Sequence, residues 1–368
     1  MEKQFKVGIV GYGVIGARRH LYCDKHPLLQ VTAVCDQKFD TTTTVADNVI
    51  AYPTPAQLLE EELDILFVCV PNDIAPDATI AGLQAGHHVF CEKPPGRTVQ
   101  DIIRVRDVEA MYPKQKLKYG FNHRYHESVK AAKDLIESGG LGEIINLRGV
   151  YGKSAFIRWP RPHVGTAEST DIKHWRTSRQ IAGGGILLDQ GIHMVDLMLS
   201  FANEPFTQIA SFVDNNFWKH DVEDNAYALM RSSSGTVAIL HSSATLWRHN
   251  FNLEISLTQG CLKLSGILTG TKSYGEEKLT VIHRKDEANG LPSESITTYV
   301  TDNSWSEEID DFVTSIVNDT PIVVGNSEAA LASMDTVHRI YQADPQWRGR
   351  TWEKTDEEKR CNLTLVAR

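Results

Sequence analysis

Three glycines near the start of the chain have the spacing of loops that bind the pyrophosphate of a dinucleotide. The motif is G-x-G-x-x-G, and its residues are Gly11, Tyr12, Gly13, Val14, Ile15 and Gly16. It follows the apolar run Phe5–Val10 and opens a predicted helix, whose free N–H groups favour phosphate. In such loops the first glycine permits a tight turn, the second leaves room for the pyrophosphate, and the third lets helix and strand pack closely. The motif predicts a dinucleotide site, with a plain glycine-rich turn as the alternative.

An acidic residue follows the second apolar run, at the distance that dinucleotide-binding units use to recognise ribose. Asp36 ends the run Gln30–Cys35, about 20 residues beyond Gly16. A carboxylate there accepts hydrogen bonds from the adenosine ribose and repels a 2′-phosphate, which favours NAD over NADP. Lys38 weakens this preference, because a cation two residues further on is able to pair with the extra phosphate.

A lysine follows the fourth apolar run, in the segment Glu92-Lys93-Pro94 after His88–Cys91. In a doubly wound sheet the carboxyl ends of the strands face the ligand crevice. From this edge Lys93 is able to hydrogen-bond a substrate hydroxyl and to stabilise negative charge that develops on its oxygen. The alternative is an ordinary solvated loop lysine.

A run of three glycines, Gly183–Gly185, precedes a predicted helix that carries two acids and a histidine. Asp189, His193 and Asp196 are spaced i, i+4 and i+7, so they share one helical face. An acid one turn from a histidine orients the ring and strengthens it as a base. The three glycines allow a close backbone approach to another group. The pattern predicts a catalytic Asp189–His193 pair, and a capping aspartate with a core histidine is the alternative.

Other polar clusters give weaker signals. His123 and His126 flank Arg124, but no third ligand has metal-like spacing, so we expect no metal site. Trp175-Arg176 and the run Trp159–His163 are either a substrate-facing loop or ordinary surface.

The pattern of strand-like and helix-like segments along the chain predicts two domains. Residues 1–121 alternate strand-like and helix-like segments, which predicts an α/β, doubly wound parallel sheet covered on both faces. Residues 122–343 mix helices with many strand-like runs separated by glycines, which predicts an α+β domain with one large, predominantly antiparallel open sheet. Residues 344–368 form a polar tail without an assigned role. The first domain's strands are expected at 5–10, 30–35, 65–70, 88–91 and 117–120, and the second domain's helices at 129–137, 185–201 and 305–317.

Composition narrows the class of protein. The chain has 368 residues, 41% hydrophobic and 23% charged, with a net charge of −9, as in ordinary globular proteins. An acidic balance argues against nucleic acid or an anionic membrane as partner. No apolar run approaches the ~20 residues of a spanning helix, and no signal peptide is recognisable. The six cysteines form no C-x-x-C pair, so we expect a cytoplasmic protein. The open sheet leaves a broad face uncovered, so we expect a homodimer or homotetramer.

Together these motifs resemble the Gfo/Idh/MocA family of NAD(P)-dependent oxidoreductases, which includes glucose–fructose oxidoreductase and inositol dehydrogenase. The resemblance runs from Phe5 to about Ala343, with the pieces in the family's order. The pieces are the glycine motif, Asp36, Pro71-Asn72, the segment Ala85–Pro94, Gly142-Glu143-Ile144, Trp175-Arg176, and the triple glycine with Asp189 and His193. One departure is Ala75, where the family often has histidine. A softer similarity links Tyr151–Ser154 to family members that act on sugars of surface polysaccharides.

The resemblance implies a Rossmann domain, a predominantly antiparallel second domain and oxidation of a sugar or polyol with NAD. It implies that the matching Lys93 and His193 act on the substrate hydroxyl, that Asp189 helps to hold the substrate, and that Pro71, Asn72 and Glu92 lie in cofactor-binding segments. Polar donors suited to a polyhydroxylated substrate are Asn122, Arg124, Trp175 and Arg176. Two alternatives stay open: a glycosidase that uses bound NAD transiently with no net oxidation, and a non-catalytic NAD-binding regulator.

Overall fold

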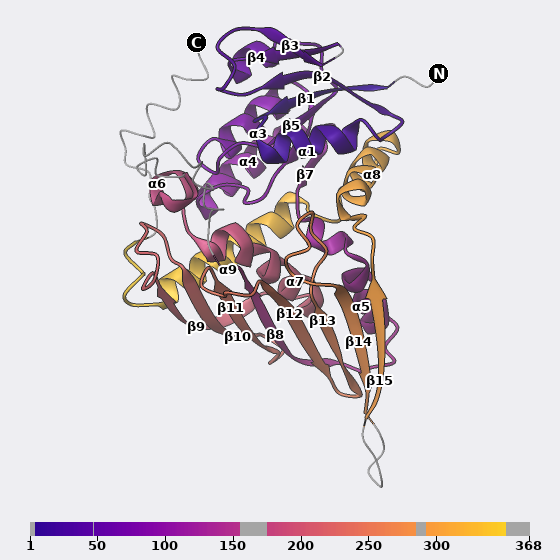
Figure 1. Cartoon of the computed structure of the whole chain (residues 1–368), viewed down its shortest axis with the longest axis vertical. Helices are drawn as coiled ribbons and strands as arrows, with labels where there is room; N and C mark the ends of the chain where they lie inside the picture. The colour runs from indigo at the N-terminus through magenta and orange to yellow at the C-terminus, as the bar shows by residue number, and fades with distance from the viewer. Residues whose placement is uncertain (1–3, 47, 155–174, 285–291, 351–368) are drawn as a thin grey trace, which may run out of the picture. The chain divides into compact units, whose positions relative to one another are not determined.

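The chain divides into two compact units in a computed structural model that describes residues 4–46, 48–154, 175–284 and 292–350 (Figure 1). Within these residues, unit 1 comprises the chain up to Asn122 together with Ser304–Leu331, and unit 2 comprises His123–Asn303 together with the chain from Ala332 onward. The segment Ser304–Leu331 therefore differs from the expectation that the second domain runs unbroken from 122 to 343. The run Trp159–His163 lies outside the described residues.

Unit 1 is built on a seven-stranded sheet of order β3-β4-β2-β1-β5-β6-β7. All neighbouring strands are parallel except β3 and β4, so the parallel strands have the doubly wound order 3-2-1-4-5-6 when counted among themselves. The predicted parallel sheet is confirmed, whereas the short β3 and β4 were not expected. The strands are β1 (Phe5–Val10), β2 (Leu29–Cys35), β3 (Thr43–Ala46), β4 (Val49–Tyr52), β5 (Ile65–Val68), β6 (His88–Cys91) and β7 (Leu117–Tyr119).

Helices cover both faces of this sheet. On one face, α8 (Ser304–Val317) packs Phe312 against Phe67 and Phe90 of the strands, in the same core as Cys23 of α1 (Val14–Cys23). On the other face lies α3 (Ala75–Gln84), where a Cβ at Gly82 would stand 2.7 Å from Leu66. The apolar face of α8 therefore explains why Ser304–Leu331 belongs to unit 1. The remaining helices are α2 (Pro55–Leu58) and α4 (Val99–Met111).

Unit 2 contains an eight-stranded sheet of order β15-β14-β13-β12-β8-β11-β10-β9. All neighbours are antiparallel except β8 and β11, which confirms the predicted, predominantly antiparallel open sheet. Residues of β10 alternate between buried and exposed, as in a sheet with one solvated face. The strands are β8 (Ile144–Gly152), β9 (Phe206–Asp214), β10 (Asn225–Ser232), β11 (Val237–Ser243), β12 (Asn250–Leu257), β13 (Gly260–Ser265), β14 (Glu277–His283) and β15 (Ser293–Tyr299).

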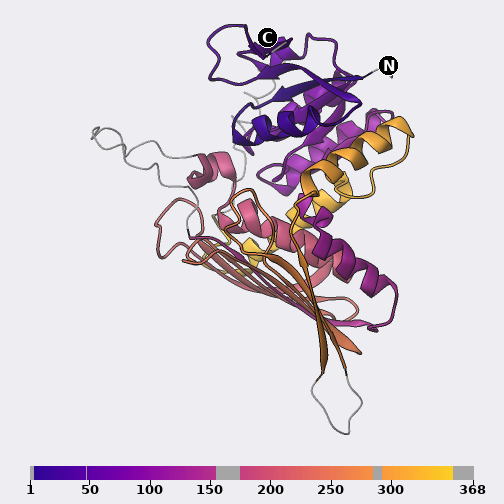
Figure 2. The same ribbon diagram turned by 45° about the vertical axis from the view of Figure 1, so that its right-hand side comes forward.

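One face of this sheet carries the helices α5 (Glu127–Glu137), α7 (Ile192–Ala202) and α9 (Ser327–Ala343), as Figure 2 shows. Close packing is visible at Gly149 of β8, where a Cβ would meet the Met198 side chain of α7 at 2.5 Å. The helix α9 was not expected, although its buried residues recur every three or four positions. These residues are Ala330, Met334, Val337 and Tyr341. Asp344 and Trp347, in the predicted tail, are also buried.

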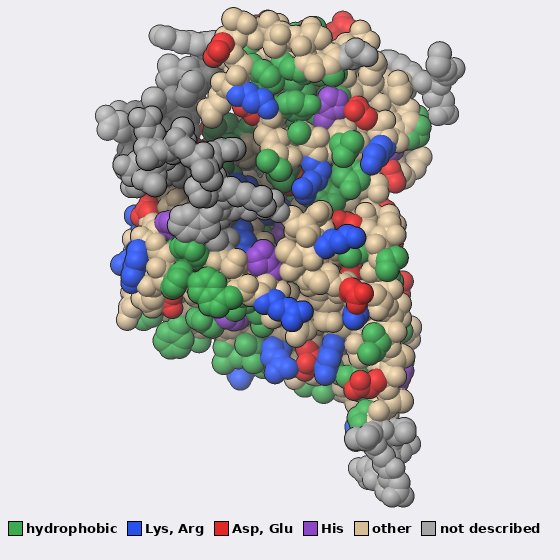
Figure 3. Space-filling model, viewed as in Figure 1, with side chains coloured by type: hydrophobic (Ala, Val, Ile, Leu, Met, Phe, Trp, Pro, Cys, Tyr) green, Lys and Arg blue, Asp and Glu red, His purple; other side chains and the backbone are tan. Residues whose placement is uncertain are grey.

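The other face of the sheet exposes apolar side chains over β9, β10 and β11. Phe212 is 77% exposed and pairs in register with Tyr227, and Leu229 is 53% exposed beside Ile239. Figure 3 shows hydrophobic side chains gathered over this part of unit 2. No helix within the described ranges has the length and apolar character needed to cross a bilayer.

Candidate active site

The glycine motif has the geometry of a nucleotide-binding turn. Gly11 has a φ of +89°, and a Cβ there would lie 2.4 Å from the Cys69 carbonyl oxygen. A Cβ at Gly16 would lie 1.9 Å from the Gly11 carbonyl oxygen, so only glycine allows α1 to start this close to β1. A Cβ at Gly13 would meet no described atom within 4 Å, so this position borders open space. These contacts match the roles that dinucleotide-binding glycines have.

The start of α1 fits a phosphate group. Gly13 is the N-cap, no side chain of the described residues caps the helix, and its first turn contains no acid. Val14, at the first helical position, is 77% exposed, and Ile15 follows it. Because the first N–H groups of a helix have no partners within the helix, this end attracts an anion. The residues present therefore suit the pyrophosphate of NAD.

Asp36 lies beside this turn. Its Oδ2 accepts a hydrogen bond of 2.8 Å from the N–H of Tyr12, and its Oδ1 accepts one of 3.1 Å from the N–H of Lys38. The ammonium group of Lys38 donates to the Tyr12 carbonyl oxygen at 2.5 Å. The carboxylate is thus fixed against the glycine motif, where dinucleotide-binding folds place the adenosine ribose.

The other unit 1 residues of the predicted site follow the carboxyl ends of neighbouring parallel strands. Pro71 and the buried Asn72 follow β5, and the half-buried Lys93 follows β6 and precedes a cis peptide bond to Pro94. Asn122 follows β7, and its side-chain amide donates to the hydroxyl of Ser304 at 3.1 Å. Since these strands are adjacent and parallel, the sheet places the four residues along one edge.

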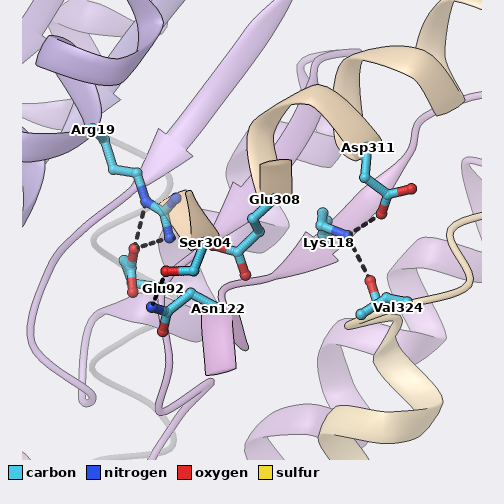
Figure 4. A network of polar contacts seen from close by, with 8 residues as sticks. All are labelled: Arg19, Glu92, Lys118, Asn122, Ser304, Glu308, Asp311 and Val324. Carbon is cyan, nitrogen blue, oxygen red and sulfur yellow. Dashed lines mark hydrogen bonds and ion pairs between the residues drawn. The ribbon is translucent and has the colours of Figure 1, made fainter. Parts of the chain in front are cut away.

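Glu92 makes its main polar contact inside the protein. Its Oε1 accepts a hydrogen bond of 2.7 Å from Nε of Arg19, a buried residue of α1 (Figure 4). A cofactor contact from the Glu92 side chain stays a prediction, whereas the ion pair gives this residue a structural role that the sequence did not reveal.

The triple glycine of unit 2 packs against a buried carboxylate. Glu223 accepts hydrogen bonds from the N–H groups of Gly185 at 2.7 Å and Leu187 at 2.9 Å, and from the Tyr341 hydroxyl at 2.8 Å. Burial raises the pKa of Glu223 to about 7, against the opposing effect of these donors. A Cβ at Gly184 would lie 2.3 Å from the Tyr341 hydroxyl oxygen. The close approach expected from the glycines is therefore made to protein groups, which anchor the turn that precedes Asp189.

Asp189 and Asp196 have cationic partners that the sequence interpretation did not foresee. Asp189 is held by Lys153 Nζ at 2.9 Å and by Arg176 Nε at 3.3 Å. Asp196 accepts two hydrogen bonds from Arg124, at 2.7 and 2.6 Å. The segment Leu187–Gly191 is a π-helical turn, so the regular α-helical spacing assumed for Asp189 and His193 does not apply there. Lys153 is the residue that sequence reasoning missed, although it lies in the segment Tyr151–Ser154 that resembled the family.

His193 lies in a group of aromatic side chains. Its ring stacks on that of His123, with centroids 3.8 Å apart and planes inclined by 12°. The Nε2 atom of His123 lies 3.0 Å from the hydroxyl of Tyr151, and burial raises the pKa of Tyr151 well above its ordinary value. His193 is 4% exposed. Stacking on His123 thus fixes the orientation of the His193 ring. Proton transfer by His193 would take place at its ring nitrogens.

The structure also describes Trp175, Arg176 and His126, whose signals in the sequence were weaker. Trp175 begins a short 3₁₀ turn, and the guanidinium of Arg176 lies 4.3 Å from the centroid of the Trp175 ring. His126 pairs with Glu277, at 2.7 Å between Nδ1 and Oε2. Among the residues described, no group of three His, Cys, Asp or Glu side chains is arranged to hold a metal ion.

Comparison with known proteins places the chain in a family. Residues 5–121 match the family described as "Oxidoreductase family, NAD-binding Rossmann fold", and residues 129–263 match its "GFO/IDH/MocA C-terminal domain". The chain is 27% identical over 356 residues to D-glucoside 3-dehydrogenase of Escherichia coli (strain K12), covering 92% of this chain and 95% of that protein. It is 23% identical to myo-inositol 2-dehydrogenase of Thermotoga maritima, covering 89% of this chain and 92% of that protein.

Solved structures show the same fold. A levoglucosan dehydrogenase in complex with NADH and levoglucosan superposes with a TM-score of 0.77 at 19% identity, covering 93% of this chain and 97% of that one. Aldose-aldose oxidoreductase from Caulobacter crescentus superposes with a TM-score of 0.74 at 20% identity, covering 96% of this chain and 100% of that one. Because the two family matches together span more than half of the sequence, the chain belongs to the Gfo/Idh/MocA family of oxidoreductases.

Proposed function

We propose that this protein is an NAD-dependent dehydrogenase that oxidises a secondary hydroxyl of a sugar, a polyol or a derivative of these. The observation that carries the substrate class is the polar cluster of unit 2, in which Asp189 is held by Lys153 and Arg176. Such a cluster offers donors and an acceptor to a molecule with several neighbouring hydroxyl groups. In unit 1, the uncapped start of α1 and the open space at Gly13 suit NAD.

The proposed mechanism assigns one task to each side chain. His193 takes the proton of the hydroxyl that is oxidised, and Lys93 donates a hydrogen bond to the same oxygen. Asp189, oriented by its two cations, accepts a hydrogen bond from a neighbouring hydroxyl. NAD, when bound, supplies the hydride acceptor for the carbon that loses its hydrogen. The remaining predicted substrate contacts are Asn122, Arg124, Trp175 and Arg176; of these, Arg124 also donates two hydrogen bonds to Asp196.

The relatives support this reading over its alternatives. By name, D-glucoside 3-dehydrogenase and myo-inositol 2-dehydrogenase each act on one ring position of a polyhydroxylated molecule. None of these relatives supports a glycosidase without net oxidation or a non-catalytic regulator.

A substrate panel tests the proposal. Sugars, glycosides, inositols and nucleotide sugars are incubated with the protein and NAD, and NADH is measured by absorbance. We expect NADH from at least one polyol or sugar, and a large loss with His193→Ala. Release of a leaving group from a glycoside without NADH would support the glycosidase instead, and NAD binding without any turnover would support the regulator.

We also propose a homodimer or homotetramer, formed through the uncovered face of the unit 2 sheet. Its exposed apolar residues are Phe212, Tyr227, Leu229 and Ile239. Contiguous exposed apolar area of this kind is typical of an interface. Light scattering should report more than one subunit at micromolar concentration, and Leu229→Glu should lower the mass; a monomeric wild type would contradict the proposal.

A reducing, cytoplasmic location is part of the same proposal. It is supported by the free thiols of the cysteines that the structure describes, namely Cys23, Cys35, Cys69, Cys91 and Cys261. Fractionation of the producing cells, followed by detection of the protein, tests it.

A further inference from the structure

Arg19 is a charged residue whose side chain is completely buried. Its side chain on α1 is 0% exposed, and its guanidinium group lies between two aromatic rings, 4.3 Å from the centroid of Phe90 and 4.3 Å from that of Trp305. Burying a cation is unfavourable unless carboxylates compensate it. Two do so: Glu92, at 2.6 Å from Nη2, and Glu308 of α8, at 2.8 Å from the same nitrogen.

These contacts connect the cofactor-binding helix to the residue that precedes Lys93. Figure 4 shows Arg19 reaching from its helix to the carboxylate of Glu92. The backbone of Glu92 is fixed as well, since its N–H donates to the Val68 carbonyl oxygen at 2.9 Å. At the end of β7, a Cβ on Gly120 would lie 3.0 Å from Oε2 of Glu92 and 3.1 Å from Nη2 of Arg19. Glu92 is therefore held by its main chain, its side chain and its packing.

We propose that Arg19 is a positioning residue for Lys93, which it holds through Glu92, while Glu308 fixes the guanidinium from the side of α8. The inference rests on the proposed role of Lys93 in the reaction. A preorganised donor must be placed within a fraction of an ångström of the oxygen that it stabilises, and misplacement by about 1 Å lowers rates by as much as ~100-fold. Loss of Arg19 releases the Glu92 carboxylate and removes one of the restraints on the position of Lys93.

The contacts at this position suit arginine better than lysine. Burial lowers the pKa of Arg19, but the charges of Glu92 and Glu308 outweigh this effect and hold the pKa above its ordinary value. A planar guanidinium is able to stack between two rings and to donate in two directions at once, whereas an ammonium group is a compact point charge. Lysine at position 19 would keep the positive charge, but its single ammonium group would not reproduce the planar set of donors with which Arg19 contacts Glu92 and Glu308.

The neighbouring Lys118 provides a matched control. It is also 0% exposed and also pairs with α8, through Asp311 at 2.6 Å, and it donates to the Val324 carbonyl oxygen beyond that helix at 2.7 Å. Figure 4 shows Glu308 between Arg19 and Lys118. Replacing Lys118 therefore removes a buried cation that pairs with the same helix, from the other side of Glu308, although its partner Asp311 is 40% exposed.

The experiment compares full-length Arg19→Met, Arg19→Lys, Glu92→Gln and Lys118→Met with wild type. For each we measure the melting temperature, the Kd for NAD, and kcat and KM for the substrate that the wild type oxidises. We expect Arg19→Met to lose about 10–100-fold in kcat with the Kd for NAD changed less than about threefold, and Arg19→Lys to recover part of the loss. Lys118→Met should lower the melting temperature similarly and keep kcat within about twofold of wild type.

A double-mutant cycle tests whether Arg19 acts through Glu92. The double variant Arg19→Met/Glu92→Gln should have the same kcat as Arg19→Met alone, because Arg19→Met has already removed the ion pair between the two residues. Additive losses, a wild-type kcat in folded Arg19→Met, or an equal kcat loss in Lys118→Met would each overturn the inference. If Arg19→Met does not fold, Arg19→Lys and Glu92→Gln form the cycle.

Lys93→Ala, measured in parallel, separates this inference from the proposed function. If Lys93→Ala turns over like wild type, the proposed role of Lys93 is wrong and the role of Arg19 falls with it. If Lys93→Ala is impaired while every Arg19 variant is normal, only the Arg19 inference is overturned.

Discussion

The N–H of Gly185 donates a 2.7 Å hydrogen bond to the carboxylate of Glu223, a residue that lies 38 positions further along the chain. The contact is possible because residue 185 has no side chain: a Cβ there would lie 2.1 Å from the Glu223 carbonyl oxygen. Glu223 thereby anchors the turn from which Asp189 and His193 extend. The position of the proposed catalytic groups depends on this packing of glycine against a buried acid.

Gly185→Ala should therefore lower both stability and turnover. The new methyl group would collide with main-chain atoms, which cannot rotate away, and overpacking of this kind costs about 1–3 kcal/mol. Urea unfolding and kcat of the remaining folded protein measure the two effects. Gly140→Ala is the control, because Gly140 is exposed and its nearest contact would be at 3.8 Å. Equal behaviour of the two variants would contradict the proposed anchor.

Asp36→Ala should narrow the preference for NAD over NADP. The Asp36 carboxylate is fixed by the Tyr12 N–H, at the place where a 2′-phosphate would approach it, and its removal abolishes the repulsion. Lys38, on the same turn, would then favour the phosphate. The Kd of each cofactor is measured for wild type, Asp36→Ala and the charge-matched control Asp40→Ala. Equal binding of both cofactors by the wild type would refute the role given to Asp36.

Much of unit 1 could be predicted because its signals are local. At Gly16 the close contacts are with Gly11 and Ile9, only a few residues earlier in the chain, whereas the contact of Gly11 with the Cys69 carbonyl oxygen comes from a neighbouring strand. The pairing of Arg19 with Glu308 joins residues 289 positions apart, and no periodicity or spacing reports such a contact. For the same reason the sequence did not show that Ser304–Leu331 returns to unit 1.

In unit 2 the structure gives Asp189 partners that the sequence interpretation did not foresee. Asp189 was expected to orient His193, and the structure pairs it with Lys153 and Arg176. The expectation assumed a regular α-helix, and the π-helical turn at Leu187–Gly191 changes the angular relation between the two residues. The helix α9 shows a different failure, since its apolar spacing was present in the sequence and was not recognised.

The stability of the protein should contain a pH-dependent contribution from Glu308. Burial raises the pKa of Glu308 from 4.5 to about 7, against the opposing charges of Arg19 and Lys118. Between these two pH values the native state holds a proton that the unfolded state has released, so the contribution to the unfolding free energy falls as the pH rises. Glutamine does not titrate. Relative to wild type, Glu308→Gln should therefore become more stable as the pH rises from about 5 to about 8.

Urea unfolding at several pH values measures this difference, in which the titration of all other groups largely cancels. Glu62→Gln is the control, because the Glu62 side chain is 93% exposed, and its difference from wild type should be small at every pH. A difference for Glu308→Gln that stays constant with pH would show that Glu308 keeps an ordinary pKa.

His193→Ala and Lys93→Ala should each damage turnover far more than cofactor binding. A general base contributes about 10²–10⁴-fold to rate, and loss of one preorganised donor costs about 3–4 kcal/mol. Because both groups are proposed to act on one oxygen, the losses should be less than additive. A core histidine would behave differently: its replacement would lower the melting temperature and leave the folded fraction fully active. Such a His193→Ala protein would refute the catalytic assignment.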